Sequence, residues 1–394
     1  MFGFNVQKEP LIVKIIETSQ YKYDLTEFDK IDILFIKNNY IHDLSTKRLN
    51  KLFKILQEKE EKFKIIFESL NLISFTDYKL EKYNNVLSKN YQVESNNFLL
   101  KNDSNFMINE KFIKYLYHKT HNYSFDNPRN SVLKRNITVN KKPAIVTAAN
   151  SAYYSALQAT VFHIHKHFPD YPLIIYDLGL DEESYKTTIA NCKCVVKKFD
   201  MNKLYERTSA HISNLKTYAW KPLLIQETLI EYETVLYVDS SIRFQSSEIS
   251  SIIDSVRQVG MLTQYIELKL NCYTNPKMFE WFEDTPSTYD DFFTIEANIL
   301  LFHRNFLTSL IMKAWVTCAL EESCISPIGS RIDSCCGCHR YDQDALTIIN
   351  SYFYGHPKDS RMHLPPYSFT REESFFFKIR RYEGMDYFKN QAIK

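Results

Sequence analysis

Residues 143–180 read PAIVTAANSAYYSALQATVFHIHKHFPDYPLIIYDLGL, and three segments of this stretch have the pattern of regular secondary structure. A short apolar run at 143–149 predicts a buried strand, and the longer stretch at 151–167 predicts a helix. A second apolar run at 172–176 predicts another strand. A strand, a helix and a strand in this order indicate a βαβ unit, in which the two strands lie parallel in one sheet.

The same alternation continues toward the C-terminus. Pro222 fits the first turn of a helix, where its missing N–H removes no hydrogen bond. The expected helices are 181–191, 222–232, 246–258, 305–320 and 342–354, and the expected further strands are 194–199, 235–238, 260–265 and 297–302. The sequence therefore predicts an α/β protein with a Rossmann-type, mostly parallel sheet and helices on both faces. Ligands bind such sheets at the carboxyl ends of the strands.

The composition changes near residue 140. The preceding part is rich in Lys, Asn, Glu, Phe and Tyr, and residues 47–69 have an amphipathic pattern that favours a helix. Residues 32–45 favour a strand, a turn at Asn38-Asn39 and the start of a helix. We therefore expect a smaller mixed α/β N-terminal region at 1–140, the main α/β domain at 141–385 and a tail at 386–394.

The composition excludes several classes of protein. The chain of 394 residues has only 7 glycines, too far apart for a dinucleotide fingerprint, a P-loop or a nucleophile elbow. A net charge of +2 gives no reason to expect nucleic acid as a partner. The apolar runs are too short to span a bilayer, and Glu9, Lys14 and Glu17 interrupt any signal-peptide core. The sequence as given thus predicts a soluble chain with no transmembrane segment.

The stretch VLYVDSSIRF, residues 235–244, contains the sharpest candidate site. Asp239 directly follows a predicted buried strand, where a carboxylate can hold a divalent cation or ribose hydroxyls. A cation at that position would neutralise a diphosphate leaving group. The alternative is that Asp239 only caps the turn after the strand.

A second candidate is the acidic cluster that opens the predicted helix 342–354. Asp342, Gln343 and Asp344 stand in its first turn, where carboxylates also complement the helix dipole. Helix capping is therefore the alternative to ligand binding at this position.

The chain from about 143 to 385, roughly 60% of its length, resembles a nematode-rich invertebrate family of uncharacterised glycosyltransferase-like proteins with the GT-A, nucleotide-diphospho-sugar transferase fold. The resemblance is most specific around Trp315 and in the run that starts at His339. The matching stretches are PAIVTAANSAYY at 143–154, LIIYDLGL at 173–180, YAWKPLLIQE at 218–227, VLYVDSSIRF at 235–244, AWVTCALEESCISPIGSR at 314–331 and HRYDQDAL at 339–346.

The resemblance implies a hexosyl- or related transferase that moves a sugar from a nucleotide diphosphate, with UDP-sugar as the expected donor, to a glycan or protein acceptor. It places Thr147, Ala148 and Ala149 at the nucleotide and assigns Asp342 and Gln343 to the donor sugar or acceptor. The alternative is a binding protein that keeps the fold and has lost catalysis.

Asp239 and Ser241 stand where GT-A enzymes carry Asp-x-Asp, the pair that holds Mn²⁺ or Mg²⁺. The second position is a serine here, and a hydroxyl is a weaker ligand for such ions than a carboxylate. Metal dependence is therefore in question.

Two further side chains complete the expected site. Glu296, which with Asn298 flanks the start of a predicted strand, is a candidate to deprotonate the acceptor. Lys221 is a candidate to hold the diphosphate, since a compact ammonium suits phosphate. For both residues the alternative is an ordinary solvated surface side chain.

Eight cysteines carry information on the compartment. Five of them fall within 21 residues, at 318, 324, 335, 336 and 338, in a spacing that differs from zinc-ribbon patterns. The cluster favours disulfides in an oxidising compartment, with a zinc site that includes His339 and free thiols as the alternatives. Together with the family resemblance, this predicts the Golgi or another part of the secretory lumen.

His163, His165 and His167 lie in a predicted helix and favour an ordinary helix face over a metal site.

Overall fold

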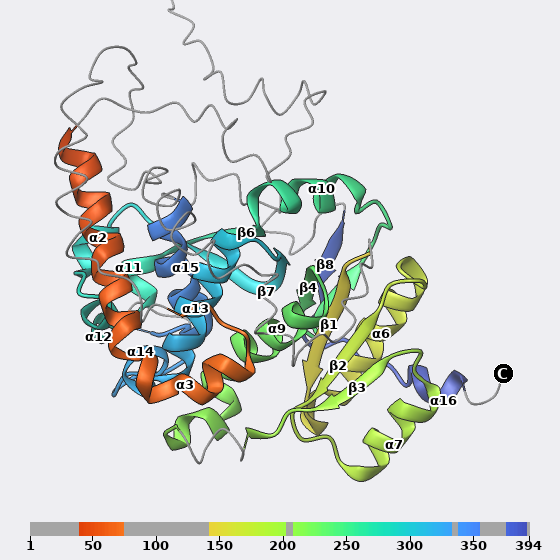
Figure 1. The fold of residues 1–394 in the computed structure, drawn as a ribbon. Coiled ribbons are helices and arrows are strands. Elements are labelled where there is room, and N and C mark those ends of the chain that lie inside the picture. Colours follow the sequence, from red (N-terminus) through yellow and green to blue (C-terminus); the bar gives the residue numbers. More distant parts are fainter. Residues whose placement is uncertain (1–38, 75–141, 202–207, 333–337, 355–375, 392–394) are drawn as a thin grey trace, which may run out of the picture. The chain divides into compact units, whose positions relative to one another are not determined.

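The computed structural model describes residues 39–74, 142–201, 208–332, 338–354 and 376–391. Its central element is a six-stranded sheet with the strand order β3-β2-β1-β4-β7-β6 (Figure 1). The strands are β1 Ala144–Ala149, β2 Leu173–Asp177, β3 Val195–Lys198, β4 Thr234–Val238, β6 Met261–Lys269 and β7 Phe293–His303. Neighbouring pairs among β1 to β4 are parallel, whereas β7 runs antiparallel to both β4 and β6. The predicted mostly parallel sheet is confirmed.

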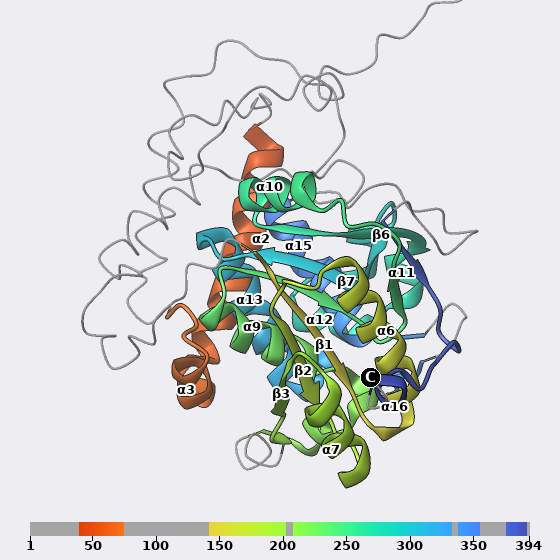
Figure 2. The same cartoon turned by 90° about the vertical axis from the view of Figure 1, so that its right-hand side faces the viewer.

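Helices cover both faces of this sheet (Figure 2). The helices of the α/β part are α6 Tyr154–His167, α7 Glu182–Asn191, α9 Trp220–Glu231, α10 Ser250–Val259, α11 Leu270–Tyr273, α12 Pro276–Trp281, α13 Phe306–Leu320, α14 Glu322–Ile325, α15 Tyr341–Tyr354 and α16 Tyr387–Gln391. Short 3₁₀ turns lie at Ser151–Tyr153, Ala210–Ser213, Leu215–Thr217 and Pro286–Tyr289. The predicted helices are present at nearly the expected bounds. The helix predicted to begin at 246 begins at Ser250.

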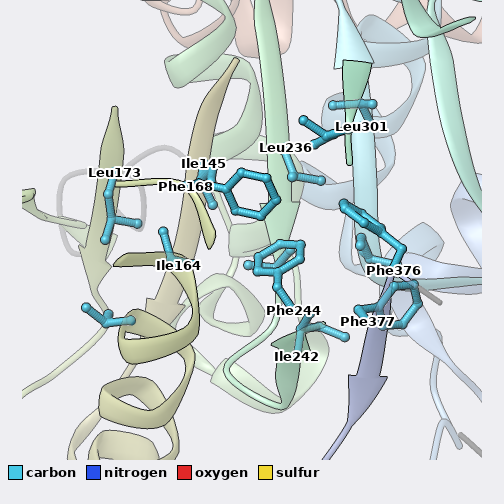
Figure 3. Packing of buried hydrophobic residues seen from close by; sticks show 14 of the residues in the cluster. Ile145, Ile164, Phe168, Leu173, Leu236, Ile242, Phe244, Leu301, Phe376 and Phe377 are labelled. Carbon is cyan, nitrogen blue, oxygen red and sulfur yellow. The ribbon is translucent and has the colours of Figure 1, made fainter. Parts of the chain in front are cut away.

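One face of the sheet packs against α6 and α10 through a continuous apolar core. Alternate strand residues such as Ile145, Leu236 and Leu301 point into it, and Phe168 from the end of α6 packs edge-on to Phe244 (Figure 3). The pair of β5 Ile242–Phe244 with β8 Phe377–Ile379 closes this core. The opposite face of the sheet contacts α9 and α15 and contains the polar residues described below.

Two helices that precede residue 74 pack on the α/β part. Helix α2 spans Asn39–Glu58 and α3 spans Glu60–Ser69, and α2 contacts α13 and α15. The described helices and strands all belong to one compact unit, which begins at Phe35. The predicted boundary at residue 140 and the predicted strand before Asn38 lie outside the described residues.

Buried ion pairs join these two helices to the rest of the unit. Arg48 on α2 donates to Asp284 at 3.0 Å and to the hydroxyl of Tyr289 at 2.7 Å, and its guanidinium lies 4.2 Å from the centre of the Tyr352 ring. Glu60 on α3 lies 2.9 Å from Lys313, which is fully buried on α13. A buried charge is tolerated only with such partners, so the pairs fix the position of α2 and α3.

The cysteine cluster at 318–338 contains a disulfide, as the sequence predicted, and a further disulfide lies outside it. Cys318 at the end of α13 is bonded to Cys324 on α14, and Cys192 is bonded to Cys194. Cys272 is also disulfide-bonded. Cys335 and Cys336 lie outside the described residues. Among the described helices, none has the length and apolar character needed to cross a bilayer.

Replacing Arg48 with alanine should destabilise the protein strongly. The variant leaves the Asp284 carboxylate buried without its cation, and removal of one member of a buried pair costs about 3–5 kcal/mol. Urea unfolding followed by circular dichroism measures the loss. The control is Lys54→Ala on the same helix, whose side chain is exposed and lies 3.9 Å from Glu58, and we expect it to change stability by less than about 0.5 kcal/mol. Equal stability of both variants would contradict the structural role of Arg48.

Candidate active site at the carboxyl edge of the sheet

The candidate site is located where β4 ends. Asp239 follows this strand directly, and its backbone N–H donates to the carbonyl of Asn298 on β7 at 2.8 Å. Since β7 runs antiparallel to β4, the first half of β7 lies beside the end of β4. The antiparallel strand therefore brings Glu296 and Asn298 to the edge at which the parallel strands end.

The predicted start of this strand was wrong. The strand was expected to begin at residue 297, with Glu296 and Asn298 at its start, but β7 begins at Phe293 and both residues lie inside it. Thr294, Glu296 and Asn298 are buried on one side of the strand. Because these buried residues are polar, they interrupt the apolar run, and a strand recognised by its apolar run is assigned a start that is too late.

Lys221 lies at the centre of the site. It stands in the first turn of α9, and its Nζ lies 2.9 Å from Oδ2 of Asp342 and 3.5 Å from Oδ1 of Asp239. The ammonium also donates to the carbonyl of Ala297 at 3.0 Å, and the hydroxyl of Tyr237 donates to Oδ1 of Asp239 at 2.6 Å. We call Lys221, Tyr237, Asp239 and Asp342 the Lys221 cluster. Its members come from the start of α9, the end of β4 and the start of α15.

Burial and the neighbouring charges shift the pKa values of Lys221 and Asp342 in opposite directions. Burial alone would lower the pKa of Lys221, but the carboxylates of Asp239 and Asp342 hold it above its ordinary value. Burial raises the pKa of Asp342, and Lys221 opposes that rise. The side chains of Lys221 and Asp342 are only 3% and 5% exposed, whereas that of Asp239 is 31% exposed. Asp239 is therefore the carboxylate of this cluster that is open to a ligand.

Two tyrosines with left-handed backbone conformation precede the charged residues of the cluster. Tyr218 has φ 54° three residues before Lys221, and Tyr341 has φ 43° directly before Asp342. This conformation costs a residue with a side chain about 1–2 kcal/mol, and such strain is concentrated at functional sites. Tyr341 is the first residue of the helix that presents Asp342 to Lys221, and the carbonyl of Asp342 accepts from the indole of Trp315 at 3.0 Å.

Glu296 lies at the same edge in a second group of polar side chains. Its Oε1 is 3.6 Å from the guanidinium of Arg381, and Arg340 also acts on its charge. Burial raises the pKa of Glu296 to about 7, and Arg381 opposes this rise. Gln264 on β6 is paired with Glu296 in the register, and its buried side-chain amide has no hydrogen-bond partner among the described residues. A carboxyl group with this pKa can accept or release a proton near neutral pH.

The two aspartates at the start of α15 have different partners. Asp342 faces Lys221, whereas Asp344 accepts from the backbone N–H of Arg340 at 2.7 Å and so caps the helix. The amide of Gln343 donates to the hydroxyl of Thr294 on β7 at 3.3 Å. Gln343 therefore connects α15 to the strand that carries Glu296.

The three predicted nucleotide-pocket residues lie in β1, and all are buried. Val146 is paired with Tyr237 in the register, so alternation puts Ala148 on the face of the sheet that carries the Lys221 cluster. Thr147 and Ala149 point to the other face, where Ala149 joins the apolar core beside α6. Of the three, only Ala148 is brought to the side of the candidate site.

Asp239 and Ser241 do not form a site that suits Mn²⁺ or Mg²⁺. One oxygen of Asp239 is already engaged by Tyr237 and Lys221, and Ser241 offers a hydroxyl in place of a carboxylate. Within the described ranges, no three His, Cys, Asp or Glu side chains are grouped closely enough to hold a metal ion. These ions prefer several carboxylate or carbonyl oxygens, which the described residues do not supply here.

Arg243, which was not among the predicted site residues, organises the loop after Asp239. This buried arginine donates to the hydroxyl of Thr160 and to the carbonyl of Ser240, both at 2.7 Å, and to the carbonyl of Glu383. It thereby ties the segment that carries Arg381 to the end of β4. Its position inside an apolar strand pattern, IRF at 242–244, was the available signal, because an arginine is rarely buried without partners.

A groove of about 1010 Å³ lies at another place in the described part of the chain. Its lining includes Trp281 on α12, Glu322 on α14 and Lys62 on α3. None of the residues of the Lys221 cluster lines it.

Residues 122–226 match a family model described as protein of unknown function (DUF1647). None of the curated proteins compared matches the chain. Solved glycosyltransferase structures are similar over about half of the chain. The galactosyltransferase LgtC with donor and acceptor sugar analogs shows 14% identity, coverage of 53% of this chain and 70% of that chain, and a TM-score of 0.34.

Mouse xyloside xylosyltransferase 1 in its apo form shows 12% identity, coverage of 57% of this chain and 84% of that chain, and a TM-score of 0.34. The glycosyltransferase GlyE of Streptococcus pneumoniae TIGR4 shows 12% identity, coverage of 53% of this chain and 43% of that chain, and a TM-score of 0.28. At these identities, none of the structures transfers its substrate or its site residues to this chain.

Stability should depend on pH through Glu296. Its pKa in the folded protein is about 7, above its ordinary value of 4.5, so the folded state binds this proton more tightly than the unfolded chain. The free energy of unfolding therefore falls as the pH rises between these two values, by at most about 3 kcal/mol. Glu296→Gln removes the titration, and we expect the variant to be more stable than the wild type by about 1–3 kcal/mol at pH 8 and by less than about 1 kcal/mol at pH 5.

Urea unfolding at the two pH values measures this difference. Glu267→Gln is the control, because Glu267 is exposed near the end of β6, and it should behave like the wild type at both pH values. A gain for Glu296→Gln that is the same at pH 5 and pH 8 would refute the buried titration.

Proposed function

We propose that this chain is a glycosyltransferase that transfers a sugar from a nucleotide-diphosphate donor to a glycan or protein acceptor. The Lys221 cluster at the carboxyl edge of the parallel strands is the observation that carries the proposal. It combines one open carboxylate, Asp239, with two buried partners that hold it in place, Lys221 and Tyr237. Fixed charges at the ligand-binding edge of an α/β sheet fit a substrate rich in hydroxyl and phosphate groups.

Each residue has a role that follows from its surroundings. Asp239 binds hydroxyl groups of the donor, since hydroxyls donate well to an oriented carboxylate. The family resemblance assigns Asp342 and Gln343 to the transferred sugar. Both are buried, so Asp342 acts through its ion pair with Lys221, which gives this region its fixed positive charge. Ala148 contributes the small side chain that lets a nucleotide approach the end of β1. These assignments extend the family resemblance to positions that lie at one edge of the sheet.

Glu296 is the residue to accept the proton of the acceptor hydroxyl. In the transfer, the bond between the anomeric carbon and the diphosphate oxygen breaks, and the acceptor oxygen forms the new bond to that carbon. The electron pair of the broken bond leaves with the diphosphate, and the acceptor proton goes to a base. A carboxylate with a pKa of about 7 at the same edge as Asp239 is matched to this task.

The secretory lumen, and the Golgi within it, is the compartment that fits this function. The bonds Cys192–Cys194 and Cys318–Cys324 support it, because disulfides persist in oxidising compartments. UDP is the nucleotide we propose for the donor.

A second candidate function is a binding protein that has the fold without catalysis. Ser241 in place of a carboxylate is the observation that favours it. Such a protein would bind the nucleotide sugar and leave it intact.

The substitution Asp239→Asn tests the function. Asparagine has nearly the same shape but lacks the negative charge, so we expect kcat/KM for transfer or donor hydrolysis to fall by about 100-fold or more. A panel of UDP- and GDP-sugars, with chromatographic detection of released nucleotide, measures the activity. The matched control is Asp254→Asn on the exposed side of α10, which should retain wild-type activity.

Three outcomes separate the candidates. Loss of activity with an unchanged unfolding midpoint supports catalysis. Nucleotide binding without turnover of any donor, weakened by Asp239→Asn, favours the binding protein. If the substitution changes neither nucleotide affinity nor turnover, Asp239 has no part in the site and the proposal fails.

A further inference from the structure

The ammonium of Lys221 lies between two carboxylates of the candidate site. Its Nζ lies between Asp342 and Asp239, at 2.9 and 3.5 Å, and donates to the carbonyl of Ala297 at 3.0 Å. An ammonium group has three N–H donors, and three acceptors surround it here. Lys221 is therefore a fixed cation of the protein in contact with both carboxylates.

A metal ion beside this ammonium would meet repulsion and, among the side chains that the structure describes, a shortage of ligands. The open oxygen of Asp239 and the hydroxyl of Ser241 are the ligands that the expected Asp-x-Asp positions offer. An ion such as Mg²⁺ or Mn²⁺ takes about six oxygen ligands, with carboxylates among the strongest. A donor set of this kind does not fit the metal that the family resemblance implies.

Two arginines of the same region, Arg381 and Arg340, have N–H groups that no described part of the chain engages. Arg381 has a side chain that is 52% exposed, and its contact with the carboxylate of Glu296 is 3.6 Å long. The N–H groups of its guanidinium are therefore not saturated by that contact. Arg340 lies near enough to Glu296 to stabilise its charge, and its buried Nε has no hydrogen-bond acceptor among the described residues. Arg381 thus contacts the carboxylate of Glu296, and Arg340 acts on the same carboxylate through its charge.

We infer that the site binds the nucleotide diphosphate without a divalent metal ion, with Arg381 and Arg340 as the ligands of the phosphates. This inference rests on the proposed function. Arginine suits the task because its planar fork of N–H donors binds two phosphate oxygens at once. Glu296 lies beside Arg381, so a diphosphate bound there stands next to the proposed base.

Isothermal titration of the full chain with UDP and with GDP tests the inference, in buffer with EDTA and in buffer with Mn²⁺. We expect the Kd of the bound nucleotide to differ by less than about 3-fold between the two buffers. Arg381→Ala should weaken binding by about 10-fold or more in EDTA, because a charge-assisted contact to phosphate is lost. The matched control is Arg380→Ala. The guanidinium of this neighbour lies 3.6 Å from the carboxylate of Glu383, and its loss should change the Kd by less than about 2-fold.

The outcomes separate this inference from the proposed function. Binding that disappears in EDTA and returns with Mn²⁺ overturns metal independence and leaves the glycosyltransferase proposal standing. Metal-independent binding that Arg381→Ala and Arg340→Ala leave unchanged overturns the assignment of the arginines. Absence of binding of both nucleotides in either buffer overturns the inference together with the proposed function.

Discussion

The burial of one positive charge, that of Lys221, is the constraint on which the candidate site depends. An ammonium group that is removed from water must be paired, and its partners come from the end of β4, from β7 and from the start of α15. These elements are distant in the sequence, and the shared cation fixes their separation. The same pairing opposes the effect of burial on Asp342, which alone would favour the neutral form of this carboxyl group.

The reversed strand β7 adds a second constraint. In a fully parallel sheet, only residues after strand ends reach the ligand-binding edge. Because β7 is antiparallel to β4, its early residues reach this edge from inside a strand. Side chains in a strand are held more rigidly than side chains in a loop, so Glu296 and Asn298 are preorganised. The cost is the burial of polar groups, which Gln264 illustrates with an amide that lacks hydrogen-bond partners among the described residues.

The order of strands and helices could be predicted from the sequence because the mostly apolar runs of β1, β2 and β4 are short and followed by polar residues. The same pattern identified Asp239, and the cluster at the start of α15 identified Asp342. Spacing could not show that Asp344 caps the helix while Asp342 pairs with Lys221, since both stand in the same turn. Arg381 could not be found either, because its approach to Glu296 depends on the pairing of β8 with β5, a contact between distant segments.

Arg243 links the geometry of the site to the order in which the chain is synthesised. The guanidinium takes acceptors from Thr160 and Ser240, which are made early, and from Glu383, which leaves the ribosome after every strand of the main sheet. Until then one side of a buried arginine lacks its acceptor, a state that costs a folded protein free energy. The edge that carries the candidate site therefore reaches its final form only when the segment around β8 has arrived.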